Sequence, residues 1–553
     1  MRTISIFCKS VVILLVAGLS MNKVTAQTTK TEQITKVYDI TPSGSLHVIS
    51  GSSNIEILTW ERNEVKVVGE LTYKGDENQE DVNKLLNAFK TMDAESSKDV
   101  LKLDLKLIIS ANSRSKILSR KIGTETVLCN GDKISINANN IKTAYTIWIP
   151  ETLSVNVESK FGKLKMASFK GNANLKLSNN DLAMEDFGES GIFEIRFSKA
   201  TIGNGGVSKF NVYNSDVKAA DLKNVTIDSR FSTFNIAKAD DVSLTSYNNN
   251  SVVFGMLNNI DASVRFSTIR IEKNAGKAKL DFHNSKLFAK NFQTMEISAR
   301  FSEFSIADVV GDTKIKTINN SQVNAAEMKN LTIDDARFSR FNIAKAEDVS
   351  LKSNNDTFVF GMLANVDVSA SFSTIRIENN AGKAKLDFNN SKLFGKNFQT
   401  MEISARFSEF NIADVDETKI DLSNNSKYNF ATVNKFNCRL SIFGTFKFDE
   451  IVVEASFPEA HNTKIDIRGT SDSFRSFSGN FRFGNVNLKL NPNVEYNLNY
   501  DGTHGQLKGV SSDIFKTRYV YNQYPSKINI QGKNADATCN IELVTNNVTF
   551  KIE

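Results

Sequence analysis

Six arginines recur along the chain, and each one directly precedes a phenylalanine. They are Arg196, Arg230, Arg265, Arg300, Arg337 and Arg406. A guanidinium group is planar and always charged, and it suits the carboxylates of an acidic glycan or of a protein partner. If these arginines align on one outward face, they form a candidate ligand-contact column.

A second interpretation of the arginines is structural. Charged side chains spaced along a β surface keep it solvated and discourage pairing with other sheets. Asp228, Glu296 and Asp335 lie near enough in sequence to neutralise some of the arginines, and Ser371 interrupts the series. The sequence leaves both interpretations open.

Other residues that commonly perform chemistry give little signal. No two of the four histidines, His47, His283, His461 and His504, are spaced like metal ligands. The turns favour Asn and Ser over the Gly- and Asp-rich patterns of calcium-binding repeats. We therefore expect no metal and no other cofactor.

Catalytic motifs are equally scarce. No glycine-rich loop opens a helix, and no serine has the pattern of a nucleophile elbow. Carboxylates such as Asp334 and Asp335 are read as solvated surface groups. Glycan-cleaving enzymes need carboxylates that converge in a groove, which loops that interrupt a repeat usually build. Residues 190–450 show no interruption, so we predict that the chain is not an enzyme.

The element that must position the arginines is an internal repeat. Residues 254–309 align without gaps to 360–415, and 47 of the 56 positions are identical. A shorter motif begins with Phe at Phe161, Phe197, Phe231, Phe266, Phe301, Phe338, Phe372, Phe407, Phe443 and Phe483. Asn-rich signatures such as "SNND" at 353 and "NNSK" at 389 lie midway between its copies. The structural period is therefore about 17–18 residues.

Each unit of the repeat alternates apolar and polar residues, which is typical of β-strands. In "MEISARFSEFNI" at 401–412, this alternation predicts that Met401, Ile403, Ala405 and Phe407 face inward. A lone unit cannot bury such a face, whereas stacked copies can. We therefore predict an all-β fold, a β-solenoid of about 17–18-residue coils with a Phe-lined core. By analogy the solenoid is right-handed.

The repeat also predicts the domain organisation. We expect a signal peptide at 1–26, a β-rich N-terminal cap at 27–150, the solenoid at 151–484 and a C-terminal β cap at 485–553. Within the N-terminal cap, Val82, Leu85, Leu86, Phe89 and Met92 have helical spacing and predict one helix. Caps are needed because the ends of a solenoid are open strand edges.

The N-terminus and the composition restrict the expected location of the protein. Val11 to Gly18 is an apolar run, too short to span a membrane, and Val24-Thr25-Ala26 fits a cleavage site. Cleavage after Ala26 leaves 65 basic and 62 acidic residues, which argues against nucleic acid as a partner. No transmembrane segment is expected in the mature chain. Its location is expected to be the periplasm, the cell surface or the exterior.

Three cysteines remain in the mature chain: Cys129, Cys438 and Cys539. They are odd in number and far apart, whereas a disulfide framework needs a dense, even set. Buried free thiols are the favoured interpretation, and one bridge between two of them stays open.

The mature chain opens with "GSLHVISGSSNIEILTWERNEVKVVGEL" and continues through coils such as "GKAKLDFNNSKLFGKNF". In these segments it resembles the bacterial family of putative auto-transporter adhesin head domains. It implies an exported β-solenoid, and the family offers no agreed catalytic residues. The expected function is a non-enzymatic adhesin or structural rod of the cell envelope, with an unidentified protein or glycan as its partner. The alternatives are a periplasmic partner in envelope signalling and an enzyme that acts on polysaccharide.

Overall fold

The computed structural model describes residues 29–74, 80–105, 107–111, 125–129, 132–136, 139–379, 381–510, 527–532 and 537–553. The expected signal peptide lies outside these residues. The described chain is nearly all β with one helix, and it forms a β-solenoid of about 18 coils that recur about 18 residues apart. The predicted fold class is confirmed. In the described chain, no helix is long and apolar enough to cross a bilayer.

The chain divides into two compact units. Unit 1 comprises residues 1–208 and 214–216, and unit 2 comprises residues 209–213 and 217–553. The boundaries that the sequence predicts at 150/151 and 484/485 stay predictions.

Unit 1 begins with antiparallel strands around the one helix. β1 (Thr29–Asp39) pairs with β3 (Glu64–Lys74), and β3 pairs with β9 (Asn139–Pro150), both in antiparallel fashion. The helix α2 (Glu80–Lys90) buries Val82, Leu85 and Phe89, as their spacing predicted. β2 (Ser45–Trp60) then runs parallel to β10 (Ser154–Met166), which starts the regular coils of this unit.

The other strands up to residue 222 are short. They are β4 (Asp93–Ser96), β5 (Val100–Leu105), β6 (Leu107–Ala111), β7 (Glu125–Cys129), β8 (Asp132–Ile136), β11 (Ala173–Ser178), β12 (Asn180–Met184), β13 (Ser190–Arg196), β14 (Lys199–Ile202), β15 (Val207–Tyr213) and β16 (Asp216–Leu222).

Unit 2 contains longer strands, most of 15–17 residues, and most coils of this unit are a single strand. The strands are β17 (Val225–Arg230), β18 (Thr233–Tyr247), β19 (Ser251–Arg265), β20 (Thr268–His283), β21 (Lys286–Arg300), β22 (Glu303–Asn319), β23 (Gln322–Arg337), β24 (Arg340–Asn354), β25 (Thr357–Ser371), β26 (Thr374–Ile377), β27 (Ala381–Asn389), β28 (Lys392–Arg406), β29 (Glu409–Asn424), β30 (Lys427–Ile442), β31 (Thr445–His461), β32 (Lys464–Ile467), β33 (Ser476–Leu488), β34 (Tyr496–Thr503), β35 (Gln506–Lys508), β36 (Lys527–Gly532) and β37 (Cys539–Ile552).

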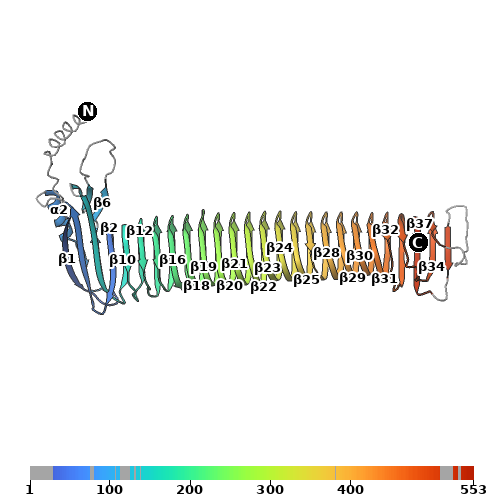
Figure 1. Cartoon of the computed structure of the whole chain (residues 1–553), viewed down its shortest axis with the longest axis horizontal. Helices are drawn as coiled ribbons and strands as arrows, with labels where there is room; N and C mark the ends of the chain where they lie inside the picture. Colours follow the sequence, from blue (N-terminus) through green and yellow to red (C-terminus); the bar gives the residue numbers. More distant parts are fainter. Residues whose placement is uncertain are drawn as a thin grey trace, which may run out of the picture. The chain divides into compact units, whose positions relative to one another are not determined.

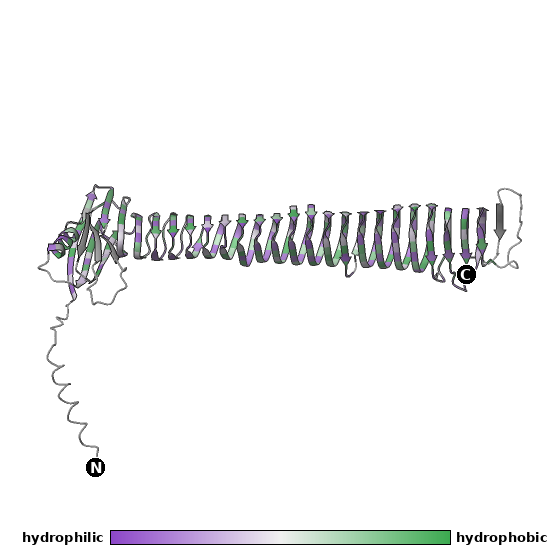
Figure 2. Ribbon diagram, turned by 90° about the horizontal axis from the view of Figure 1, so that it is seen from above, coloured by the Kyte–Doolittle hydropathy of each residue, from purple (hydrophilic) through white to green (hydrophobic). Residues whose placement is uncertain are grey.

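From β17 to β33 the successive coils stack in parallel (Figure 1). Equivalent residues of neighbouring coils lie side by side in register. Hydrophobic and hydrophilic residues alternate along each strand (Figure 2), so one set of side chains lines the interior. Phe410, Tyr428 and Phe446 lie in one such inward ladder, and their ring centroids are 4.8 and 4.7 Å apart. The core of unit 2 is therefore a stack of equivalent apolar side chains.

Two residues interrupt the strands at one corner of each coil. The first has a positive φ near 50°, and the second is buried, usually as serine. The first residue alternates between Phe and Asn along the chain, as at Phe301, Asn320 and Phe338. A left-handed residue breaks the in–out alternation, so two consecutive side chains point outward before the next points inward.

This geometry corrects one prediction. Phe407 was expected to face inward with Ala405, but its side chain is 55% exposed, and Ser408 occupies the inward position after Ala405. The same holds for all ten motif phenylalanines, which are 44–59% exposed. The core does contain phenylalanine, but at other positions, such as Phe410.

The buried corner serines form a hydrogen-bond ladder through unit 2. The backbone N–H of Ser285 donates to Oγ of Ser302 at 3.2 Å, and that of Ser302 donates to Oγ of Ser321 at 2.9 Å. Each hydroxyl in turn donates to the carbonyl two residues before it, as Ser302 does to Arg300 at 2.8 Å. The ladder satisfies backbone groups that the interrupted strands leave unpaired.

Candidate functional site

The corner of unit 2 presents three adjacent columns of residues from about residue 230 to 485, which we call the corner strip. The first column holds the residue before each corner, the second holds the corner residue itself, and the third holds the residue two positions later. The corner column alternates phenylalanines, the Phe row, with asparagines, the Asn row. The Phe row is Phe231, Phe266, Phe301, Phe338, Phe372, Phe407, Phe443 and Phe483. The Asn row is Asn248 with Asn249, Asn284, Asn320, Asn355, Asn390, Asn425 and Asn462.

The predicted arginines occupy the first column. Arg265, Arg300 and Arg337 are exposed, and they stand in register with His283 and Asn319 between them. Arg230 and Arg406 hold equivalent places in unit 2, whereas Arg196 lies at the end of β13 in unit 1. Successive arginines from Arg230 to Arg337 are two strands apart, or roughly 9.5 Å at strand spacing, and Ser371 lies between Arg337 and Arg406.

The arginines are less neutralised than their sequence neighbours suggested. Nε of Arg337 lies 3.0 Å from Asp335, but Glu296 pairs with Lys316 at 2.6 Å. The guanidinium groups of Arg230 and Arg265 lie 5.9 and 5.6 Å from the centroid of Tyr247, one on each neighbouring coil. Within the described residues, Arg230, Arg265, Arg300 and Arg406 form no ion pair.

The Phe row lies beside this column. The ring of His283 is 6.0 Å from both Phe266 and Phe301, and it meets each edge to face. Aromatic rings, guanidinium groups and an imidazole thus share one surface, and about half of each phenylalanine remains in contact with water.

The corner strip carries a strong excess of positive charge. Its three columns contain two acidic residues, Glu303 and Glu409, which pair with Lys286 at 2.7 Å and with Lys392 at 3.3 Å. The basic residues are Arg230, Arg265, Lys286, Arg300, Arg337, Arg340, Lys392, Arg406, Lys427, Lys464 and Arg482. The whole chain is close to neutral, so this strip is a local concentration of positive charge.

The strip also has depth. A hollow of 400 Å³ lies between Phe301 and Phe338, with Asn320 between them and Lys286 and Arg340 at its sides. Phe301 and Phe338 therefore form two ridges, and Asn320 lies in the notch that separates them.

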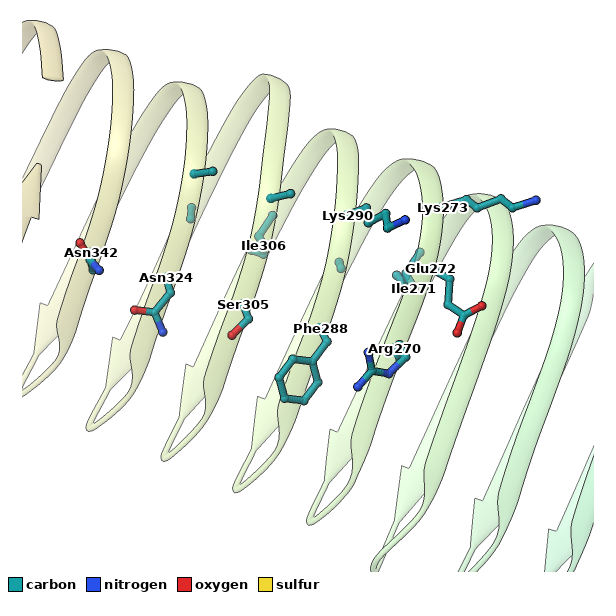
Figure 3. Close-up of a pocket in the computed structure, with 14 residues that line it drawn as sticks. Arg270, Ile271, Glu272, Lys273, Phe288, Lys290, Ser305, Ile306, Asn324 and Asn342 are labelled. Carbon is teal, nitrogen blue, oxygen red and sulfur yellow. The ribbon is translucent and has the colours of Figure 1, made fainter. Parts of the chain in front are cut away.

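A larger hollow of 790 Å³ lies elsewhere on unit 2, over β20 to β24 (Figure 3). The guanidinium of Arg270 lies 5.2 Å from the centroid of Phe288, and the two side chains stand side by side on neighbouring coils (Figure 3). Arg376 and Phe394 repeat this contact at 5.1 Å in the duplicated segment. Glu272 is the one carboxylate among the described residues that line the hollow, so the paired carboxylates of glycan hydrolysis do not meet there.

The cysteines and the metal-ligating residues form no second site in the described chain. Cys438 and Cys539 are buried free thiols, and burial raises the pKa of Cys539 to about 12. The side chain of Cys129 lies outside the described residues. Among the residues that the structure describes, no group of three His, Cys, Asp or Glu side chains could hold a metal ion.

The Phe row is the part of the strip that the sequence interpretation missed. Phe and Asn alternate at the same place in successive coils, which implies one shared backbone conformation. Asn is common in the left-handed conformation, so the alignment of Phe301 with Asn284 and Asn320 was the available signal.

Comparisons with known proteins assign no family to the chain. No family model and no curated protein matches the chain. One solved structure that it matches is described as a "putative cell adhesion protein" from Clostridium sporogenes, with 12% identity, 43% of this chain and 99% of that chain covered, and a TM-score of 0.15. Another is described as a "Putative lipid binding protein" from Parabacteroides distasonis, with 12% identity, 58% and 98% coverage, and a TM-score of 0.14. Similarities this weak carry no argument about function.

Proposed function

We propose that this chain is an exported, non-enzymatic adhesion or scaffolding protein of the bacterial cell envelope. The observation that carries the proposal is the corner strip. It presents a phenylalanine at every second coil with basic residues beside this row, and the 790 Å³ hollow over β20 to β24 is lined by one carboxylate, Glu272. A periodic surface suits attachment to an extended partner, whereas catalysis needs a small set of convergent groups.

Export is part of the proposal, and the segment that supports it is the apolar run from Val11 to Gly18 with the cleavage site after Ala26. The test is protease digestion of intact cells that produce the full chain, followed by detection with an antibody to unit 2. We expect digestion without permeabilisation. A cytoplasmic protein and a periplasmic protein serve as markers of cell integrity.

The same experiment separates the two locations. Protection until the outer envelope is permeabilised would favour a periplasmic partner in envelope signalling instead. Attachment of cells with and without the protein to glycan-coated surfaces then measures adhesion directly, and equal attachment would contradict the proposed role.

A further inference from the structure

We infer that the corner strip binds an extended anionic polysaccharide whose repeating unit matches the spacing of two coils. This inference rests on the proposed function and names its ligand class. Four features carry it: the conformation of the Phe row, the charge of the strip, its spacing and its notches.

The Phe row is not required by the fold. The backbone N–H of Phe301 donates to the carbonyl of Asn319 at 2.9 Å, and the N–H of Asn320 donates to that of Arg337 at 3.0 Å. Asn therefore makes the same corner with the same hydrogen bond, and it adopts the left-handed conformation more readily than Phe. Each phenylalanine is thus strained and half exposed where Asn would serve, and strained positions of this kind cluster at binding surfaces.

The charge of the strip selects an anion. Both acidic residues of the strip are already paired with lysines, while Arg230, Arg265, Arg300 and Arg406 have no ion-pair partner in the described chain. Guanidinium groups without an ion-pair partner in the chain can form paired hydrogen bonds with carboxylate or sulfate groups of a ligand.

The regular spacing of the side chains in the strip favours a polymer as the ligand. Phenylalanines recur at every second coil, or roughly 9.5 Å along parallel strands in register, and arginines do so from Arg230 to Arg337. This length is close to that of a disaccharide unit in an extended glycan. A glycan with one acidic group per disaccharide could therefore meet an arginine and a phenylalanine at each repeat between Arg230 and Phe338.

The notches distinguish a glycan from other anionic partners. The apolar C–H face of a sugar can cover a phenyl ring while its hydroxyl groups meet the amide of Asn320 in the hollow between Phe301 and Phe338. A lipid surface that covered the phenylalanines would take these amides and the neighbouring guanidinium groups out of water, which is costly. A second copy of the strip would bring like charges together.

The test measures binding of the purified mature chain to hyaluronan oligosaccharides, which carry one carboxylate per disaccharide. The first variant changes Arg230, Arg265, Arg300 and Arg337 to Ser, the residue found at position 371. The second changes Phe266, Phe301, Phe338 and Phe372 to Asn, the residue that makes the alternate corners. The control changes four exposed lysines outside the strip to Ser: Lys238, Lys277, Lys329 and Lys435.

We expect both strip variants to bind at least about tenfold more weakly, and the control variant to bind like the wild type. Wild-type binding should weaken as salt rises, since the contacts are charged and exposed. A neutral chitin oligosaccharide of equal length should bind poorly. Circular dichroism of each variant confirms that the coils remain folded.

Several results would overturn the inference. They are equal binding of the Phe-to-Asn variant, preferential binding to single-stranded DNA or to vesicles of phosphatidylcholine and phosphatidylglycerol, and a dimer that depends on the Phe row. If hyaluronan and other anionic glycans fail to bind but producing cells still attach to surfaces, the ligand class is wrong and the proposed function stands. If producing cells attach no better than cells without the protein, and the protein is protected from protease in intact cells, the proposed function is rejected.

Discussion

At the scale of single residues, the conformation of the corner decides which aromatic rings stabilise the fold. Phe301 and Phe304 lie three positions apart in one coil, yet Phe301 is 53% exposed and Phe304 is fully buried. The left-handed φ of Phe301 turns its side chain outward, and the next two residues lead the chain back into the core.

The first prediction compares these two phenylalanines. Phe304→Ala should cost about 3–5 kcal/mol, because it leaves a cavity in the inward ladder. Phe301→Asn should leave stability unchanged or raise it by up to about 1 kcal/mol, because it relieves left-handed strain. Hydrogen exchange of the backbone amides in β21 and β22 measures the local change in stability for each variant. A large loss of protection in Phe301→Asn would show that the exposed ring supports the fold.

The second prediction concerns Asp356, which replaces the usual serine in the corner ladder and is 3% exposed. Burial raises the pKa of Asp356 above its ordinary value of 3.8, despite hydrogen bonds from Ser339, Ser353 and Asn354. The native state therefore holds the proton more tightly than the unfolded chain does. The contribution of this group to stability is full below the ordinary pKa and is lost as pH rises through the raised pKa.

Asp356→Ser should remove this loss, so the variant should be more stable than the wild type at neutral pH. Chemical unfolding across a pH series checks the expectation. Parallel pH profiles for the two proteins would mean that the carboxylate is not destabilised by its surroundings.

At the scale of the element, the coil depends on hydrogen bonds that pass from one serine to the next. Oγ of Ser302 accepts from the N–H of Ser285 and donates to the carbonyl of Arg300, inside a corner that water does not reach. The ladder thus connects coils at the point where the strands are interrupted.

The third prediction follows from this connection. Ser302→Ala should cost about 1–3 kcal/mol, because it leaves the buried N–H of Ser285 without an acceptor. The partly exposed Ser305, three residues later in β22, is the matched control, and Ser305→Ala should change stability by less than about 0.5 kcal/mol. Thermal unfolding of the two variants gives the comparison, and equal midpoints would show that water or a neighbouring group replaces the hydroxyl.

The coil also shows how far the sequence could be interpreted. Period-two alternation placed Met401, Ile403 and Ala405 in the core, and the structure confirms all three. It misplaced Phe407, because alternation assumes an extended backbone and cannot register a left-handed residue. Each arginine still belongs to the extended strand before the corner. The alternation therefore holds there, and the arginines point outward. The contact of Arg230 and Arg265 with Tyr247 depends on side chains of three coils, which no local pattern reveals.

At the scale of the whole molecule, the stability of a solenoid is a sum of terms for coils and for contacts between neighbours. The duplicated segments lie 106 residues apart, which equals three Phe coils and three Asn coils. Removal of residues 310–415 would join Val309 to Asp416, just as Val415 joins Asp416 in the full chain.

The fourth prediction is that this shortened chain folds with the remaining coils in register. The unfolding free energy of the shortened chain should depend less steeply on denaturant concentration than that of the full chain, because less surface is exposed on unfolding. The matched control removes residues 310–406, which breaks the coil register and should prevent cooperative unfolding. Aggregation of both proteins alike would contradict the interchangeability of the six-coil segments.

The near-identity of residues 254–309 and 360–415 has a genetic consequence. If the gene is as repetitive as the protein, unequal recombination between the two copies would delete or add one whole block and leave the reading frame intact. Each such event would change the Phe row by three members without creating a new corner. Strains of one bacterium could then differ in the number of contacts that this surface offers while every variant remains foldable.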